Sequence, residues 1–424
     1  MRKTIQVFIV LKSVKRAFYF CLLSIIAPLY GIVDNRFRDP ALNNKVFIVH
    51  DPEACTTFEG QLFVETAKHS FGCDQRTGLF ELSSPYKLRQ LDQALLASGR
   101  IEQSLIPSYW LGVLTEGRYV MSGHLQTQGF GFHFRQQYAS HWELGVRGEI
   151  LHANSRLTLI KDQAFDTGLG GQGNQNELTL LQESIHKALD LCPALWSDTV
   201  FGDMELYTRL FAHKNYAYKC RFIDAGLSFG IILPAAPARD IFNPASIPLG
   251  GNRHWGCFVD ADLDAVLRYD MRAGFYLRVQ KRFSRVDRLR VAQSGEPSMY
   301  GSVIGNFKVD PGVTVMFSPY FIQEGLREGF GIRIAYMGVK HFSDSFSDRR
   351  SDQSIEVNFD ALKEESKWGK DYVTLSFLYD FAYGRVEHYF EPVIALTVDA
   401  PVDFWATERA AKTFGIAFAL EMNY

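Results

Sequence analysis

The sequence predicts an all-β protein: a closed antiparallel transmembrane β-barrel of about twelve strands, with short periplasmic turns and long extracellular loops. Three observations predict this fold. Long segments alternate apolar and polar residues, their connections alternate between short and long, and the chain ends at Tyr424 directly after such a segment. The alternation predicts the strands, the connections predict their up-and-down order, and the last segment predicts where the barrel closes.

The N-terminal region predicts export. Residues 1–16 carry five basic side chains and no acid, and the apolar stretch AFYFCLLSIIAPLYG follows. This pattern predicts a signal peptide over residues 1–31. A membrane anchor is the alternative, but the stretch is short for a bilayer span and Pro28 interrupts it. Residues 32–56 have no clear pattern and are interpreted as an N-terminal periplasmic arm or partial plug, and residues 57–424 as the barrel.

Composition excludes several classes. With 47% hydrophobic residues the chain is not a disordered protein. Beyond the signal no run of about 20 apolar residues is found, which argues against a helical membrane protein. Without residues 1–31 the chain has 40 Lys and Arg against 47 Asp and Glu, a formal charge of −7. This balance argues against a nucleic-acid partner.

Motifs for metal and cofactor chemistry are missing from the sequence. The five cysteines after the signal form no CxxC pair and have no histidine-rich spacing. The glycine-rich stretch GLGGQG at 168–173 lacks the strand-to-helix context of a dinucleotide site, so it is interpreted as a flexible loop. We therefore expect no metal and no cofactor.

The last segment, TFGIAFALEMNY, shows the strand pattern most clearly. Its apolar side chains fall on one face and its small or polar side chains on the other, because side chains of a strand alternate between faces. The same pattern recurs upstream, for example in ELGVRGEI at 143–150. The twelve predicted strands are 57–70, 123–138, 141–156, 201–213, 216–233, 255–270, 272–285, 311–323, 327–343, 370–383, 386–399 and 411–424.

The connections between these segments fall into two groups. Short turns are predicted near Ala139-Ser140, Lys214-Asn215, Met271, Glu324-Gly325-Leu326 and Gly384-Arg385. The other connections run from about ten to more than fifty residues, and the two kinds alternate, so all short turns lie at one end of the sheet. In hydrocarbon every backbone polar group must be paired, which requires the first strand to pair with the last. A soluble sandwich is disfavoured because its charged row would coat the outside.

In these features the chain resembles the bacterial outer-membrane β-barrel proteins as a class, whose last strand alternates apolar residues and ends on an aromatic. The resemblance covers nearly all of the chain after the signal. It implies a location in the bacterial outer membrane, surrounded by outer-membrane lipid. It also implies that the barrel-assembly machinery reads the last strand through Phe418, Leu420, Met422 and Tyr424.

The polar face predicts a charged lumen. The candidate lumen-facing, solute-contacting residues carry both signs: Glu143, Arg147, Glu149, Glu205, Arg209, Asp260, Asp262, Asp264, Arg268, Arg278, Arg282 and Arg333. In one interpretation they line a hydrated pore, and the protein is a passive channel for small polar or charged solutes. In the other they pair across strands and plug the lumen of a structural or adhesive surface barrel. A barrel of about eight strands is filled by side chains and one of about sixteen has an open channel, so a strand count of twelve does not decide between the two interpretations.

An outer-membrane lipid hydrolase is a more distant alternative. His341 and Ser343 have the spacing of the histidine and serine of outer-membrane phospholipases. They share the parity of Arg333, however, which places them on the lumen face rather than towards lipid. The family's asparagine and glycine after the serine are Asp344 and Ser345 here, so we expect no enzymatic activity.

Some local features modify this scheme. Pro319 and Pro392 each remove a ladder donor, which predicts that their strands bulge or end earlier. An additional hairpin around 115–117 would raise the count to fourteen. Short helices are predicted in the loops at 86–99, 176–191 and 359–369.

Overall fold

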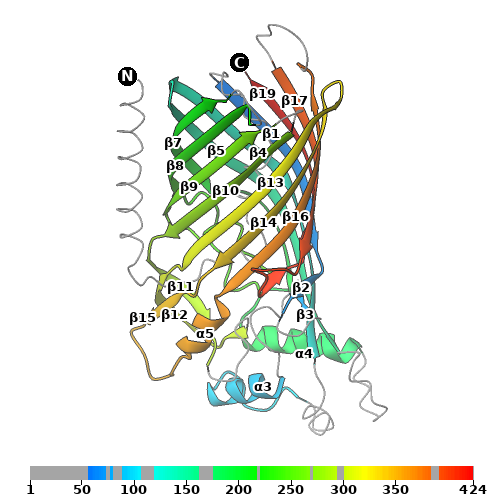
Figure 1. Cartoon of the computed structure of the whole chain (residues 1–424). Coiled ribbons are helices and arrows are strands. Elements are labelled where there is room, and N and C mark those ends of the chain that lie inside the picture. Colours follow the sequence, from blue (N-terminus) through cyan, green and yellow to red (C-terminus); the bar gives the residue numbers. More distant parts are fainter. Residues whose placement is uncertain are drawn as a thin grey trace.

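The computed structural model describes residues 56–72, 77–79, 88–106, 119–161, 175–216, 220–267, 271–293, 300–382 and 391–423. Within this part, twelve strands form one closed antiparallel barrel (Figure 1). These strands are β1 (Thr56–Ala67), β4 (Tyr119–Ala139), β5 (Trp142–Lys161), β7 (Met204–Asn215), β8 (Phe222–Leu233), β9 (Gly256–Val266), β10 (Met271–Arg282), β13 (Val313–Arg327), β14 (Phe330–His341), β16 (Trp368–Asp380), β17 (Glu391–Val402) and β19 (Phe414–Asn423).

The strands follow one another around the barrel in chain order, and the ring closes between its ends. β1 pairs with β19 from Thr57 opposite Asn423 to Thr66 opposite Phe414. β1 also pairs with β4 on its other side, so no edge is left open there. The predicted seam is therefore confirmed. β4 itself begins at Tyr119, and the ring has twelve strands rather than fourteen.

The two faces of the barrel differ as the alternation predicts. On β19 the outward side chains of Ile416 and Phe418 are 58% and 46% exposed, whereas the inward Ala419 and Glu421 are buried. The same division holds on β16, where Leu375 and Phe377 face out. The outside is thus an apolar band, and the inside is polar or small.

The long connections form a cap at one end of the barrel. Figure 1 shows the three helices and the small strands gathered there, while β19 ends at the opposite, short-turn end. The helices predicted in the loops are confirmed as α3 (Leu88–Ala97), α4 (Gln175–Ala188) and α5 (Phe359–Glu365). The small strands are β2 (His69–Phe71), β3 (Thr77–Gly78), β11 (Arg285–Val291), β12 (Val303–Asp310), β15 (Ser345–Asp348) and β18 (Ala410–Ala411). A further short strand, β6 (Leu195–Phe201), pairs with β5 and belongs to the barrel sheet.

A core of apolar side chains holds the cap on the barrel. Leu91 and Leu95 of α3 and Leu178 of α4 belong to one buried cluster with Leu151 and Leu157 on the inner face of β5. The helices therefore extend the barrel's interior rather than decorating its rim. None of the described helices is long and apolar enough to cross a membrane.

Three predicted turns lie elsewhere in the structure. Met271 is the first residue of β10, and Lys214-Asn215 are the last residues of β7, so both turns shift by a few residues. β13 continues past the predicted Glu324-Gly325-Leu326 turn, and the chain reverses at Glu328 and Gly329, which have φ of 36° and 89°. The reason is an irregular register between Gln323 and Arg327, where Gly325 has φ 61°. The predicted Gly384-Arg385 turn lies outside the described residues.

The bulge predicted at Pro319 is wrong. β13 runs through Pro319 in constant register with β10, where Phe275 lies opposite the proline. On the β14 side only the ladder positions of Ser318 and Pro319 are skipped, because proline has no donor. Pro392 is the second residue of β17, which begins later than predicted.

Candidate functional site

The lumen is the candidate site, and four strands supply most of its charges. The inward positions are odd-numbered on β5 and β7 and even-numbered on β9 and β10. They carry the predicted charges because lumen and lipid positions alternate along each strand. Of the predicted residues Glu143, Arg147, Glu149, Glu205, Arg209, Asp260, Arg278, Arg282 and Arg333 are buried inside the barrel.

The first cluster of charges crosses the lumen around Glu205. Arg278 binds Glu205 with two bonds, Nη2 to Oε1 at 2.6 Å and Nη1 to Oε2 at 3.1 Å. Arg147 binds the same carboxylate through Nε and Nη2. Asp260 lies 3.8 Å from Arg278 and 3.9 Å from Arg147. Both guanidinium groups lie against the ring of Phe258, at 4.0 and 5.2 Å from its centre.

The second cluster surrounds Arg209. Its Nη2 donates to Asp224 Oδ2 at 2.5 Å and to Asp262 Oδ2 at 2.6 Å. Glu143 lies 3.8 Å away. One arginine is thus shared by three carboxylates.

Two further arginines of β10 form ion pairs near the ends of the strand. Arg272 lies 3.6 Å from Asp264 and 3.2 Å from Glu324. At the other end Arg282 lies 2.7 Å from Asp203. Charges are therefore paired at several heights along the lumen wall, as the plugged interpretation predicts.

Arg333 differs from the other described lumen arginines. It is 3% exposed and no ion pair is found for it within the described residues, although the charges of Asp264, Asp399 and Glu59 act on it at longer range. Its guanidinium lies over the Tyr320 ring, 4.6 Å from the centre. Burying a charge without a direct partner costs desolvation free energy, so Arg333 is an energetically unfavourable position in the lumen wall. Arg268 lies outside the described residues.

A loop also enters the barrel, which the sequence reasoning did not predict. The β8–β9 connection is buried at every residue from Asn243 to Gly251. Ala245, Ile247 and Leu249 belong to the same apolar cluster as the cap helices. We call residues 243–251 the plug loop. Its proline-containing, uncharged sequence, NPASIPLGG, is the signal that would have found it.

A few polar contacts hold the plug loop in place. Asp203 lies between β6 and β7 and accepts from the backbone N–H of Gly251 at 2.7 Å and of Ala236 at 3.2 Å. Ser155 on β5 donates to the carbonyl of Ala245. Asn243 Nδ2 donates to the carbonyl of Leu195 at 2.9 Å. The loop is thus fixed to the barrel by single bonds rather than by a ladder of strand pairs.

The residues of the hydrolase alternative do not form a lipid-facing site. His341 is buried inside the barrel, Nδ1 lies 2.8 Å from Thr314 Oγ1, and Nε2 lies 2.8 Å from Asp344 Oδ1. Its ring stacks on Trp368. Both ring nitrogens are thus engaged, and neither by Ser343. No group of three or more possible metal ligands is found in the described part of the chain.

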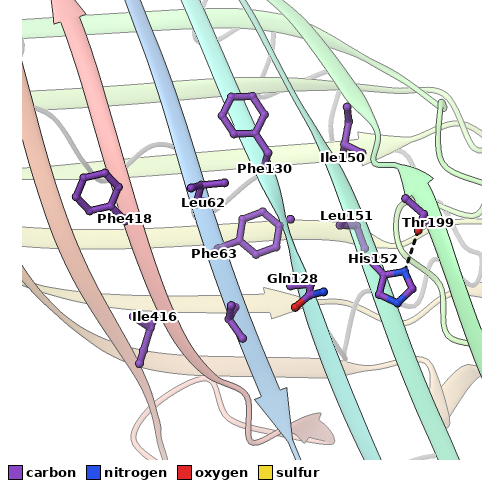
Figure 2. Close-up of a pocket in the computed structure, with 12 residues that line it drawn as sticks. Leu62, Phe63, Gln128, Phe130, Ile150, Leu151, His152, Thr199, Ile416 and Phe418 are labelled. Carbon is purple, nitrogen blue, oxygen red and sulfur yellow. Dashed lines mark hydrogen bonds between the residues drawn. The ribbon is translucent and has the colours of Figure 1, made fainter.

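The residues of the predicted assembly signal lie on the outer face of the seam. Phe418 and Leu420 are exposed and Met422 is half-buried, while the alternate residues of β19 are buried. Tyr424 lies outside the described residues. The wall around Phe418 also forms a groove, which Figure 2 shows with its lining residues.

No protein-family model and no curated protein matches the chain. Among solved structures it is similar to the COG4313 outer membrane channel from Pseudomonas putida F1, at 10% identity over 89% of this chain and 100% of that chain, with a TM-score of 0.46. It is similar to the transport unit of the autotransporter AIDA-I from Escherichia coli, at 8% identity over 91% and 95% of the chains and a TM-score of 0.38. LpxR from Salmonella typhimurium matches at 10% identity over 86% and 100%, with a TM-score of 0.24.

Likeness at this level carries no inference about solute or activity. The architecture itself is the firmer finding, because the ring of twelve strands closes on itself, the outside is apolar and the inside is charged. The chain therefore has the architecture of the bacterial outer-membrane β-barrel class.

Proposed function

We propose that this protein is a gated passive channel for small polar or charged solutes in the bacterial outer membrane, and that the structure represents its closed state. The observation that carries the proposal is the plug loop, which lies inside the barrel but is held by a few polar contacts. Because the plug loop is not part of the ring of strands, it can leave the lumen without breaking a strand-to-strand hydrogen bond; only its bonds to Asp203, Ser155 and Leu195 and its apolar packing are lost. A purely structural barrel with a permanently plugged lumen would not need a plug that can move out.

The charged side chains in the lumen support the proposal that the transported solutes are polar or charged. In the proposed open state solutes pass Asp262 on β9 and Arg333 on β14, two side chains of opposite charge that lie three strands apart in the wall. Opposed charges of this kind orient a polar solute and exclude apolar ones. The predicted export signal and the apolar outer band support the outer-membrane location, and lipid and the assembly machinery are the expected partners.

The test is planar-bilayer conductance of refolded wild type and of Asp203→Asn, which weakens the acceptor for Gly251 and the ion pair with Arg282. We expect rare openings in wild type and several-fold more open time in the variant. Asp198→Asn is the matched control, because this exposed carboxylate on β6 accepts only from its neighbour Thr199. Heat-modifiable migration in a denaturing gel establishes that each barrel is folded.

A structural or adhesive barrel with a permanently plugged lumen is the second candidate, favoured by the paired charges around Glu205. It predicts no conductance in any variant, including one that lacks residues 243–251. Conductance in that deletion variant would exclude a lumen closed by the charge network around Glu205, and openings in wild type would exclude a permanent plug. A folded deletion variant that shows no conductance would overturn the channel proposal.

A further inference from the structure

A groove of about 740 Å³ lies on the lipid-facing wall, outside the lumen. Its lining is almost entirely apolar and comes from β19, β1, β4, β5 and β6, with Leu62, Phe130, Ile150, Ile416 and Phe418 on its apolar side (Figure 2). Several of these side chains are about half exposed. The groove therefore opens to the surroundings of the barrel and not to the proposed solute path.

Two rows of side chains form the groove because the strand register aligns them. Leu62 lies opposite Phe130, which lies opposite Ile150. Two residues further along each strand towards the cap, Val64 lies opposite Gln128, and Gln128 opposite His152. The first row is apolar and the second is mostly polar. The groove thus lies across the boundary where the apolar band of the barrel ends.

The polar row is held rigidly. His152 Nδ1 lies 2.8 Å from Thr199 Oγ1, and Asn154 Nδ2 lies 3.1 Å from His152 Nε2. Figure 2 shows the contact between His152 and Thr199 at the edge of the groove. A fixed ring at the end of an apolar groove presents a defined polar surface to a bound molecule.

A basic pair lies two rows further towards the cap, beyond the row of Gln126 and Asn154. Arg156 is exposed on β5, directly opposite His124 on β4. No ion pair of Arg156 is found within the described residues. The outward positions around it, Thr66, Gln126 and Asn154, carry no acid, and the exposed carboxylate of β6, Asp198, belongs to the alternate row. A cation without a partner at the membrane boundary attracts anionic lipid.

We propose that this groove binds one anionic, phosphate-bearing membrane lipid. An acyl chain lies along Leu62, Phe130 and Ile150, and the phosphate lies at Arg156 and His124. The order of the surfaces matches the order of the parts of such a lipid: an apolar groove, then fixed polar groups, then a cation. A second copy of the barrel is a poorer occupant, because dimerisation through this face would bury the polar row and Arg156.

The test is native mass spectrometry of the refolded barrel in non-ionic detergent, titrated with phosphatidylglycerol or phosphatidylcholine. We expect wild type to retain one phosphatidylglycerol and little phosphatidylcholine. Arg156→Gln should weaken retention of phosphatidylglycerol about fivefold, as loss of one cation beside an anionic lipid implies. Val64→Trp, which fills the groove, should weaken retention of both lipids.

Two control variants separate the site from general effects. Arg221→Gln removes an exposed arginine at the short-turn end, and Val373→Trp adds the same bulk on the outward face of β16. Both should retain lipid as wild type does. Equal retention of the two lipids by wild type would overturn the proposal, as would equal weakening by Arg156→Gln and Arg221→Gln. A dimer that forms without lipid and dissociates in Val64→Trp would also overturn it. None of these readouts depends on conductance.

Discussion

Arg278 on β10 and Glu205 on β7 form a two-bond ion pair although two strands, β8 and β9, lie between them in the barrel wall. The pair therefore crosses the lumen rather than running along its wall. Such planar bidentate pairs are the strongest charge-assisted hydrogen bonds of arginine. Strands far apart in the ring are thus connected through the interior, which stiffens the barrel at this height.

Replacing Arg278 should lower the free energy of unfolding of the barrel much more than replacing Arg333. Arg278→Met leaves the buried carboxylate of Glu205 with one fewer partner, which should lower the free energy of unfolding by about 3–5 kcal/mol. Arg333→Met removes a buried charge that has no ion pair, so we expect a change of less than about 1 kcal/mol or a stabilisation. Urea unfolding in lipid vesicles measures both. Equal destabilisation would mean that Arg333 has an anionic partner in the lumen.

The loop at residues 405–407, at the cap end of the barrel, should need Asp371 to keep its structure. Its Oδ2 accepts from the backbone N–H groups of Trp405, Ala406 and Thr407 at 2.7 to 2.8 Å. Asp371→Ala should raise hydrogen exchange of these three amides at least about tenfold, because hydrogen bonds to a charged group contribute about 1.5–3 kcal/mol.

The control for this loop is Asp399→Ala, whose carboxylate accepts from Thr374 Oγ1 inside the barrel. It should leave exchange at 405–407 unchanged. Trp405 is 67% exposed, so loss of its anchor should also change its fluorescence in vesicles. Unchanged exchange in Asp371→Ala would show that packing rather than the carboxylate holds the loop.

The cap should loosen in mild acid through His186. Burial lowers the pKa of His186 on α4 below its usual 6.5. The ring lies 3.3 Å from the hydroxyl of Tyr300, and the neighbouring Arg290 donates to the carbonyl of Leu189. Burial also raises the pKa of Tyr300, so its hydroxyl keeps its proton. A neutral imidazole can accept that proton in a hydrogen bond, and a protonated one cannot.

The direction of the pH dependence follows from proton binding at His186. The unfolded cap binds a proton at His186 more readily than the folded cap, so the stability of the cap is lost as pH falls below about 6.5. Hydrogen exchange of α4 at pH 7.5 and 5.5 measures this. His186→Gln should remove most of the pH dependence, whereas His124→Gln on the outer wall should keep it. A cap that becomes more stable in acid would contradict the assignment.

The last strand should matter more for assembly in cells than for folding in vitro. Phe418→Ser removes one outward residue of the proposed assembly signal, and Phe377→Ser removes a comparable exposed phenylalanine on β16. Both should lower refolding yield in vesicles to a similar extent, because both weaken the apolar band. Only Phe418→Ser should strongly lower the amount of folded protein in the outer membrane. Equal losses in cells would argue against a special role of Phe418.

Local pattern was sufficient for much of this molecule. The alternation in TFGIAFALEMNY predicts both the outward row with Phe418 and the inward row with Glu421, because strand side chains alternate faces whatever the strand pairs with. The same reasoning placed Arg147, Arg209 and Arg278 in the lumen. It failed at the turn after β13, where an irregular register and left-handed residues rather than hydrophobic pattern set the reversal.

The sequence by itself determined the strands, their faces and the closing seam, since these depend on side-chain period and on the need to pair every backbone group in a membrane. Only the tertiary structure decided which charges meet. Arg278 contacts Glu205, and Asp203 holds Gly251, across strands and loops that no local pattern relates. Those contacts depend on the closure and stagger of the ring and on a loop folding into it, and both follow from long-range packing rather than from neighbouring residues.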